Sequence, residues 1–259
     1  MMLKRNLLGW RLEEYWFDEA GYLASTADIA ALRSHAAIGR EASDCSIPER
    51  TLLVPLDRAP EAILAAFDTR AKTSIRQAAK TLRVDLAASP EERELFYAAY
   101  RPFAAERGLL IPDAKEEAEL DILLARNLAG ELLQAGAFLP AKTAGVYRYR
   151  YGVYVRKSQA NAALMHAAIQ RAKSLGFTHF DLGGITSGAR PGSPEAGINF
   201  FKSQFGGIAT DSRLYLRGTR WTTRLLLRFL RASGAAARYH KLSAWAARRA
   251  RPNLSRSEA

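Results

Sequence analysis

Two neighbouring stretches decide the fold: residues 176–185 read GFTHFDLGGI, and residues 197–207 read GINFFKSQFGG. The first stretch is typical of a short buried strand, which Gly183-Gly184 ends. The second predicts a short helix from about Ile198 to Phe205. Because glycine has no Cβ atom, the glycine pair allows the backbone to turn sharply or to approach a ligand closely. A plain strand-ending turn explains the pair equally well.

Working outward, the sequence alternates between strand-like and helix-like segments. Strands are expected at 51–56, 84–87, 131–139, 144–155, 177–182 and 211–216, and helices at 59–80, 89–107, 114–128, 159–175 and 198–205. A mixed sheet flanked by helices is the packing that this order favours. The predicted fold class is therefore α/β (α+β), with the strands in one mixed sheet.

Composition limits the kinds of function that the chain can have. Its 259 residues, 48% of them hydrophobic, suffice for one large core or two modest ones. Cys45 is the sole cysteine and there are four histidines, so we expect no internal disulfide and no metal site. The apolar run at the start breaks at residues 11–14, RLEE, which is too early for a signal peptide or a membrane span. These features predict a cytoplasmic location.

The positive charge is concentrated near the C-terminus. The formal net charge is +12, and from Arg213 onward twelve Lys and Arg residues face one acid, Glu258. Arginines recur at steps of three and four between Arg217 and Arg231, which places them along one face of a helix with apolar residues beside them. Such a helix favours binding of residues 217–249 to an anionic membrane surface. The same charge also suits a tRNA backbone, or the helix packs on its own domain with its arginines in water.

Five short motifs carry a resemblance to a known protein family. Three lie within the two opening stretches: Asp-Leu-Gly-Gly, Phe-Lys and Phe-Gly-Gly. The other two are YGVYVRKSQ from Tyr151 and KTSIRQAAK from Lys72. Residues 50–217 resemble the C-terminal GNAT-like half of Fem-type aminoacyl transferases. The resemblance implies a GNAT-like acyltransferase domain over this range. Residues 1–49 then form an N-terminal extension or part of a second GNAT-like half, and residues 218–259 a basic helical tail.

The resemblance also implies a catalytic residue. In Fem-type enzymes the lysine of the Phe-Lys pair lies near the reacting carbonyl, so Lys202 is expected to stabilise the developing oxyanion. Without the resemblance, a lysine on a short helix is usually a solvated surface charge. Asp181 is the second catalytic candidate, which either orients a substrate group or accepts hydrogen bonds from the glycine turn. Gly183 and Gly184 are expected to form the floor of the site.

The remaining candidates are expected to bind an anionic, phosphate-bearing acceptor. Guanidinium and ammonium groups suit phosphate, and tyrosine hydroxyls suit phosphate or sugar. A charged solvent face and packing on the sheet are the alternative interpretations. The predicted binding residues, in addition to the two glycines, are Lys72, Arg76, Arg148, Arg150, Tyr151, Tyr154, Asn199 and Phe201.

A glycine-rich turn that would hold coenzyme A is missing from the sequence, and this bears on the acyl donor. Acetyl-CoA enzymes of the GNAT superfamily hold the pyrophosphate in a glycine-rich turn, whereas residues 155–162 read VRKSQANA and contain no glycine. The missing glycine makes acyl-CoA less favoured, and the resemblance to Fem-type enzymes implies aminoacyl-tRNA as co-substrate and no cofactor. The predicted reaction is aminoacyl transfer to an amine of a cell-envelope precursor at the inner face of the membrane. The alternatives are N-acylation from acyl-CoA or acyl carrier protein, and a non-catalytic membrane- or RNA-binding module.

Overall fold

The computed structural model describes residues 2–7, 10–107, 109, 119–156 and 160–233. The chain forms two compact units. Unit 1 comprises residues 1–49, 104–116 and 212–259, and unit 2 comprises residues 50–103 and 117–211. Two long strands, β4 (Cys45–Pro55) and β10 (Ile208–Gly218), contribute residues to both units. The N-terminal segment and the described part of the basic tail thus belong to the same unit.

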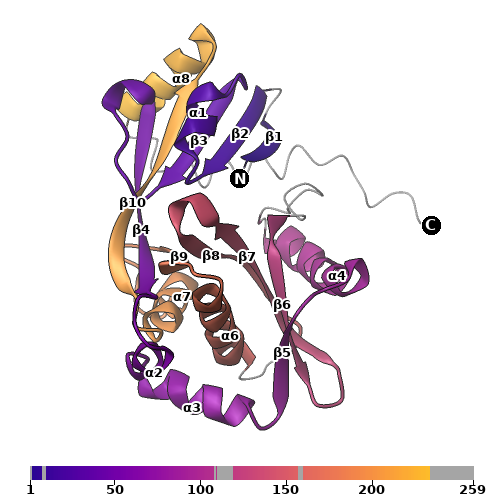
Figure 1. The fold of residues 1–259 in the computed structure, drawn as a ribbon. Helices are drawn as coiled ribbons and strands as arrows, with labels where there is room; N and C mark the ends of the chain where they lie inside the picture. Colours follow the sequence, from indigo (N-terminus) through magenta and orange to yellow (C-terminus); the bar gives the residue numbers. More distant parts are fainter. Residues whose placement is uncertain (1, 8–9, 108, 110–118, 157–159, 234–259) are drawn as a thin grey trace, which may run out of the picture. The chain divides into compact units, whose positions relative to one another are not determined.

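Unit 1 is a sheet with a helix on each face (Figure 1). Its strands follow the order β1-β2-β3-β10-β4, where β1 is Met2–Leu7, β2 is Trp10–Trp16 and β3 is Ile29–Ser34. The β2–β3 pair is parallel, whereas β1–β2 and β3–β10 are antiparallel. Helix α1 (Glu19–Ala24) covers one face and α8 (Trp221–Ala232) the other, and a short 3-10 turn, η1 (Arg40–Ala42), precedes β4.

Alternation along the strands of unit 1 divides its core between the two helices. Ala30 and Leu32 pack with Tyr22 of α1, while the intervening Ala31 packs in the cluster that contains Leu227 of α8. Cys45 is buried in the same cluster as Leu227. Burial raises the pKa of the Cys45 thiol above its ordinary value, and the described structure therefore keeps this cysteine protonated and covered.

Unit 2 contains the rest of the sheet, in the order β4-β9-β8-β7-β6-β5. The β8–β9 pair is parallel and the pairs β4–β9, β7–β8, β6–β7 and β5–β6 are antiparallel. The strands are β5 (Leu82–Leu86), β6 (Asp121–Asn127), β7 (Leu132–Ala141), β8 (Val146–Tyr154) and β9 (His179–Ile185), with the turn η2 (Lys142–Ala144) between β7 and β8.

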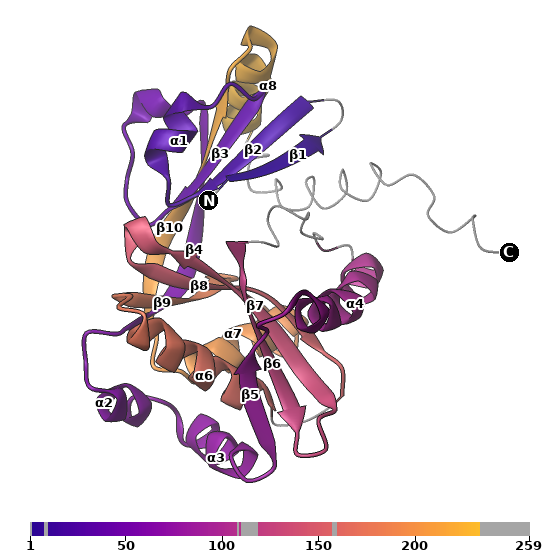
Figure 2. The ribbon, with the colours of Figure 1, turned by 45° about the vertical axis from the view of Figure 1, so that its right-hand side comes forward.

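Helices cover both faces of the unit 2 sheet (Figure 2). Helix α6 (Ala160–Ser174) packs through Leu164, Met165 and Ile169 into the main core. Helix α4 (Pro90–Arg107) lies on the opposite face, where Phe96 and Tyr100 are buried. Helices α2 (Pro60–Ala65), α3 (Thr69–Ala78) and α7 (Pro194–Ser203) complete the α6 side.

The structure confirms the predicted α/β class, a large mixed sheet flanked by helices. The helix expected over residues 59–80 is instead two helices, α2 and α3. The break is local, because Asp68 has extended backbone angles and its carboxylate accepts a hydrogen bond from the Arg70 amide. The helix expected over 114–128 is wrong for residues 121–127, which form β6. The consecutive Ile122, Leu123 and Leu124 are all buried, because both faces of this strand are covered.

The Phe-Gly-Gly element allows a close approach between α7 and α2. Gly206 has a φ of +68°, and a Cβ atom on it would lie 2.9 Å from the Ala66 carbonyl oxygen. Gly176, which ends α6, has a φ of +81° but nothing within 4 Å of such an atom. Both positions therefore need glycine for the backbone conformation, and Gly206 needs it for space as well.

We expect Gly176→Ala to lower the free energy of unfolding by about 1 kcal/mol, the usual penalty for an alanine in the left-handed region. Gly206→Ala should lower it by clearly more, because the alanine also displaces Ala66. Urea unfolding of the two variants measures the difference. Equal losses would show that the contact with Ala66 relaxes freely.

Candidate functional site

The site lies where two parallel strands stop pairing. Strands β8 and β9 pair at Val146↔His179, Tyr147↔Phe180 and Arg148↔Asp181. Beyond this last pair β8 continues against β7, and β9 continues against β4, where Gly184 faces Thr51. Backbone groups of β8 and β9 beyond Asp181 therefore do not have each other as partners. They are available to side chains and, in principle, to a ligand.

A buried carboxylate ties the strands together at this point. The Asp181 side chain is fully buried and accepts hydrogen bonds from the Thr51 hydroxyl on β4 and from Arg148 Nη1 on β8. Its Oδ1 also accepts from the Gly183 amide at 2.7 Å. Three donors from three strands satisfy the carboxylate, and the guanidinium neutralises its charge.

The same carboxylate shapes the glycine turn, which is a bulge inside β9: the strand does not end at Gly183-Gly184 as predicted but continues to Ile185, with a register shift against β4 at this point. Gly183 has a φ of +82°, and a Cβ atom there would lie 3.3 Å from both the Lys202 Nζ and the Tyr149 carbonyl oxygen. A side chain at this position would thus meet the lysine as well as strain the backbone. Gly184, the next residue, is exposed. The Asp181–Gly183 hydrogen bond therefore positions the two glycines beside the lysine.

Lys202 enters this site from α7. The residue is 9% exposed, and its Nζ donates a hydrogen bond of 2.7 Å to the Gly184 carbonyl oxygen. The side chain that the sequence singled out thus reaches the glycine turn and does not extend into bulk water. An ammonium has three N–H donors, and the structure describes one partner for this one, so two donors remain for a substrate oxygen.

The surroundings of Lys202 lower its pKa to about 8. Burial is the main cause, because it disfavours the charged form, and the positive charge of Arg148 lowers the pKa further. The Asp181 carboxylate acts in the opposite direction. Lys202 is therefore mainly an ammonium at pH 7, but it loses its proton in a range where an ordinary lysine stays charged. Such a group can act as a charged hydrogen-bond donor and can also exchange a proton near neutral pH.

Arg148 does not lie on the surface, where it would have to be to bind an anion from solvent. Its guanidinium is buried and paired with Asp181. Its neighbour Arg150, on the same strand, is half-buried, and its guanidinium lies 4.8 Å from the centre of the Tyr151 ring. The expected contact of either arginine with an anionic substrate stays a prediction.

The two tyrosines of β8 have different environments. Tyr151 is buried against Tyr100 of α4, with ring centres 5.2 Å apart. Tyr154 is exposed, and its hydroxyl accepts a hydrogen bond of 2.5 Å from Asn161 Nδ2 on α6. Tyr151 therefore packs, as the alternative interpretation had it, while Tyr154 presents a phenol to solvent.

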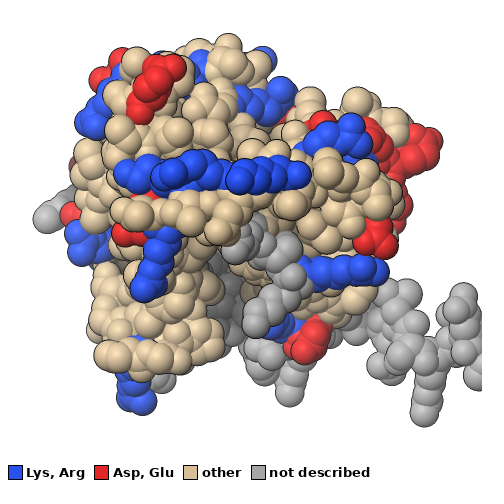
Figure 3. All heavy atoms as spheres, turned by 90° about the horizontal axis from the view of Figure 1, so that it is seen from below, with Lys and Arg blue, Asp and Glu red and all other residues tan. Residues whose placement is uncertain are grey.

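Among the described residues, no hydrogen bond links the basic helix α3 to Lys202. Lys72 Nζ donates to the Ala65 carbonyl at the end of α2, at 3.2 Å, and Arg76 is exposed. Figure 3 shows Lys and Arg side chains in a row on the face seen from below, the side on which α3 lies in Figure 1. The exposed basic residues of α3 and the segment after it are Arg70, Arg76, Lys80 and Arg83.

On α7, two further candidates have structural contacts. The Asn199 amide donates to the Thr186 carbonyl at 2.8 Å and accepts from the Thr186 amide at 3.1 Å, which fixes the chain after β9 onto α7. Phe201 is half-buried and packs on Phe205 in the main core. Both residues thus fix α7, the helix that carries Lys202.

Sequence reasoning missed Thr51. It was part of the expected strand 51–56, yet its hydroxyl is buried and donates to Asp181. A threonine in a strand is ordinary on propensity grounds, so its pattern carried no signal. The ion pair of Arg148 with Asp181 was also missed, because it depends on the register of β8 against β9.

Comparisons with solved structures identify the fold. The structure of FemX matches with a TM-score of 0.60 and 13% identity, over 88% of this chain and 86% of that one. The C-terminal domain of an Agrobacterium fabrum protein described as a lysylphosphatidylglycerol synthetase matches with a TM-score of 0.53 and 12% identity, over 90% and 88%. L-PGS from Bacillus licheniformis matches with a TM-score of 0.51 and 15% identity, over 90% and 86%.

These likenesses confirm the predicted Fem-like GNAT fold. They cover 88–90% of this chain, which is more than residues 50–217, the range of the sequence resemblance. Searches against protein families and against curated proteins found no match. Within the described residues, no helix has the length and apolar character needed to cross a membrane.

Asp181→Asn tests whether the buried carboxylate holds the site. The variant removes the negative charge that the buried Arg148 guanidinium contacts, so we expect the free energy of unfolding to fall by about 3–5 kcal/mol. Asp121→Asn is the matched control, since Asp121 pairs with Arg171 and accepts from the Tyr147 hydroxyl but is more exposed. Urea unfolding should show a smaller loss for the control, and an equal loss would contradict the central role of Asp181.

Proposed function

We propose that the chain transfers an aminoacyl group from aminoacyl-tRNA to an amine of a cell-envelope precursor. The observation that supports this most is the buried Lys202 ammonium beside Gly183 and Gly184. The chain shares its fold with FemX, with L-PGS from Bacillus licheniformis, and with a domain of a protein described as a lysylphosphatidylglycerol synthetase, a name that denotes joining an amino acid to a lipid.

The proposed reaction requires stabilisation of one negative charge. The acceptor nitrogen attacks the ester carbonyl carbon, and a C–N bond forms while the carbonyl oxygen becomes an oxyanion. The C–O bond to the tRNA ribose then breaks, the ribose oxygen takes up a proton, and the nitrogen loses one. Lys202 donates a hydrogen bond to the oxyanion, and this interaction is stronger in the partly buried site than it would be in water.

Other side chains have supporting roles in this proposal. Asp181 and Thr51 position the glycine turn, and Arg148 supplies the counter-charge to the carboxylate. The exposed Arg76 and the Tyr154 hydroxyl are the most accessible of the predicted binding groups for a phosphate-bearing acceptor. The other predicted binding residues stabilise the protein around the site through the contacts described above. They are Lys72, Arg150, Tyr151, Asn199 and Phe201.

The proposed acceptor sets where the enzyme works. Envelope precursors are assembled at the inner face of the membrane, so we propose that the protein acts there. No cofactor is part of the proposal, because the acyl group arrives already activated as an ester. The stretch 155–162, which lacks glycine, argues against a pyrophosphate cradle for coenzyme A.

Lys202→Ala should reduce the turnover number by about 100- to 1,000-fold, because it removes the oxyanion donor. Lys173→Ala is the matched control. Lys173 is also a helix lysine whose ammonium donates to a backbone carbonyl, that of Leu56 at 2.9 Å. Steady-state kinetics should show near-normal turnover for the control. Unchanged turnover in the Lys202 variant would exclude the proposed role.

The pH dependence tests the charge state of the lysine. Since the pKa of Lys202 is lowered to about 8, the ammonium is lost as the pH rises through that value. Turnover at saturating acceptor should therefore fall above pH 8, whereas uncatalysed aminolysis rises over the same range. Any activity that Lys202→Arg retains should not fall, because a guanidinium stays charged. Turnover that rises through pH 8 in the wild type but not in Lys202→Arg would instead make Lys202 a proton acceptor.

The donor is tested by competition between two activated acyl groups. We expect transfer of label from radiolabelled aminoacyl-tRNA to precursor amines, and none from acetyl-CoA. The wild-type protein and the Lys202→Ala variant are compared with each donor. Transfer from acetyl-CoA alone would replace this proposal with N-acylation from coenzyme A.

A further inference from the structure

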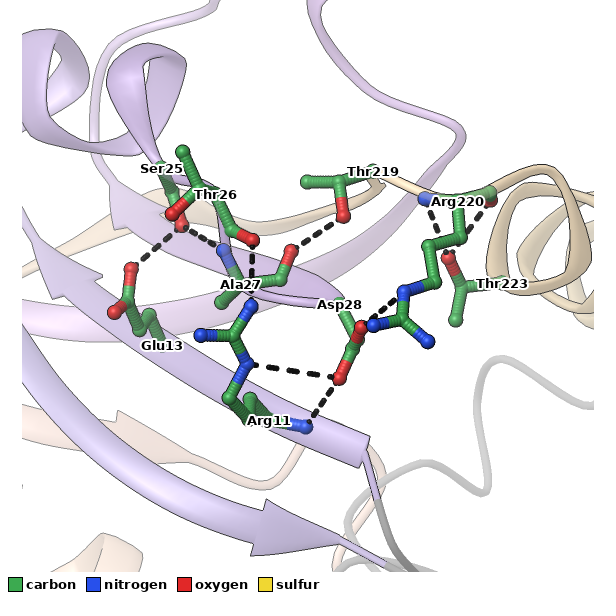
Figure 4. A network of polar contacts seen from close by, with 9 residues as sticks. All are labelled: Arg11, Glu13, Ser25, Thr26, Ala27, Asp28, Thr219, Arg220 and Thr223. Atoms are coloured by element: carbon green, nitrogen blue, oxygen red, sulfur yellow. Dashed lines mark hydrogen bonds and ion pairs between the residues drawn. The ribbon is translucent and has the colours of Figure 1, made fainter.

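Helix α8 is firmly attached to unit 1 at its first turn. Figure 4 shows the Asp28 carboxylate between Arg11 and Arg220, the residue that precedes α8. Asp28 is buried, its Oδ1 lies 2.7 Å from Arg220 Nε, and its Oδ2 accepts a hydrogen bond of 2.8 Å from the Arg11 amide. The start of the helix is therefore held by a charge-assisted contact to the beginnings of β2 and β3.

A second buried carboxylate holds the middle of α8. Asp44 Oδ1 accepts from Arg228 Nε at 3.3 Å, and Oδ2 lies 3.6 Å from Arg224 Nε. Gly218 brings the helix close to the sheet, since a Cβ atom there would lie 2.5 Å from the Arg224 amide nitrogen. Thr223 and Leu227 are buried beneath the helix. One face of α8 is thus packed against the sheet of unit 1.

The opposite face of α8 carries an apolar stripe. Trp221, Leu225 and Phe229 follow each other at steps of four, and they are 74%, 56% and 67% exposed. At 100° per residue this stripe lies roughly opposite Thr223 and Leu227. The buried face of α8 supplies Leu227 to the core of unit 1, whereas the stripe residues do not belong to that core. Large side chains of this kind in a row mark an interaction surface.

Arginines form a row along one edge of the stripe. Arg220, Arg224, Arg228 and Arg231 each precede or flank a stripe residue, and all four are exposed. Four arginines, Arg11, Arg220, Arg224 and Arg228, pair with the two carboxylates of Asp28 and Asp44, and α8 itself contains no acid. The side chains of Arg224 and Arg228 stay more than half exposed while bound to Asp44. The surface around the stripe is therefore positive as well as apolar.

We propose that the outer face of α8 docks onto an anionic lipid surface, with Trp221, Leu225 and Phe229 inserted among the acyl chains. The row of arginines then lies at the level of the lipid phosphates. This inference rests on the proposed function for its purpose, since it would hold the enzyme beside a membrane-bound acceptor. It concerns the described part of the predicted surface, residues 217–249, and assigns roles there to three inserted side chains and the arginines beside them; residues 234–249 lie outside the described residues.

The chemistry of this face favours lipid over other occupants. A tRNA backbone would be bound by the arginines but would leave the three apolar side chains in water. A second copy of the chain would bring a second row of arginines against the first. An anionic bilayer accepts both components, because aromatic and leucine side chains enter the interface and arginines bind the head groups.

Sedimentation with vesicles tests the proposal on the full-length chain. We expect binding to vesicles of phosphatidylcholine with phosphatidylglycerol, weak binding to phosphatidylcholine alone, and a decrease with salt. The triple variant Trp221→Ser, Leu225→Ser and Phe229→Ser should bind about 100-fold more weakly, as expected for loss of three inserted apolar side chains. Unchanged binding by this variant would overturn the proposal, as would equal binding to the two kinds of vesicle.

The matched control replaces three exposed leucines elsewhere, Leu23→Ser, Leu128→Ser and Leu175→Ser, which are 48%, 66% and 48% exposed. Its vesicle binding should equal that of the wild type. Urea unfolding of both triple variants shows whether each one is folded. Sedimentation velocity without vesicles is the further control: a wild-type dimer that the α8 variant converts to a monomer would assign the stripe to a second copy and overturn the proposal.

Quenching of tryptophan fluorescence by brominated lipids identifies the inserted residue. We expect quenching in the wild type and in Trp245→Phe, and its loss in Trp221→Phe. Loss in Trp245→Phe alone would overturn the assignment to α8. Vesicle binding does not depend on turnover, so a protein that binds vesicles through α8 but transfers no aminoacyl group would contradict only the proposed function. A protein with transferase activity and no vesicle binding would contradict only this inference.

Discussion

The carboxylate of Asp181 is the interaction on which the site depends. It is buried at the last pair of the parallel strands β8 and β9, and it accepts hydrogen bonds from β4, β8 and the glycine turn. Each contact has a separate consequence: Arg148 supplies the counter-charge, Thr51 fixes β4, and the Gly183 amide sets the turn. An uncompensated charge in such a position would be strongly unfavourable, so the three contacts stabilise the site as a unit.

Lys202 depends on this arrangement in turn. Its ammonium reaches the Gly184 carbonyl past Gly183, where a Cβ atom would lie 3.3 Å from the Lys202 Nζ and where the backbone is left-handed. The balance between Arg148 and Asp181 around it also sets how readily it gives up its proton. The arrangement therefore combines a geometric constraint, the glycine turn, with an electrostatic one, the pair of opposite charges nearby.

The residues of the site were easier to predict than their contacts. Lys202, Asp181 and the two glycines come from short stretches near each other in the sequence, and the structure brings them together. Thr51 and the Arg148–Asp181 pair depend on strand register, which local patterns do not determine. Most strands of unit 2 were expected from the alternating segments, although their order in the sheet was not, and β6 was mistaken for a helix because a strand covered on both faces has no period of two. The N-terminal strands gave no clear pattern and were not predicted.

The buried position of Cys45 has a practical consequence. It is the one cysteine in the sequence, and it lies in the core cluster of unit 1 with Leu227 of α8. A thiol reagent can therefore reach the chain at a single position, and only when that cluster opens. The rate of alkylation thus reports the opening of unit 1 without a contribution from unit 2, and no introduced label is needed.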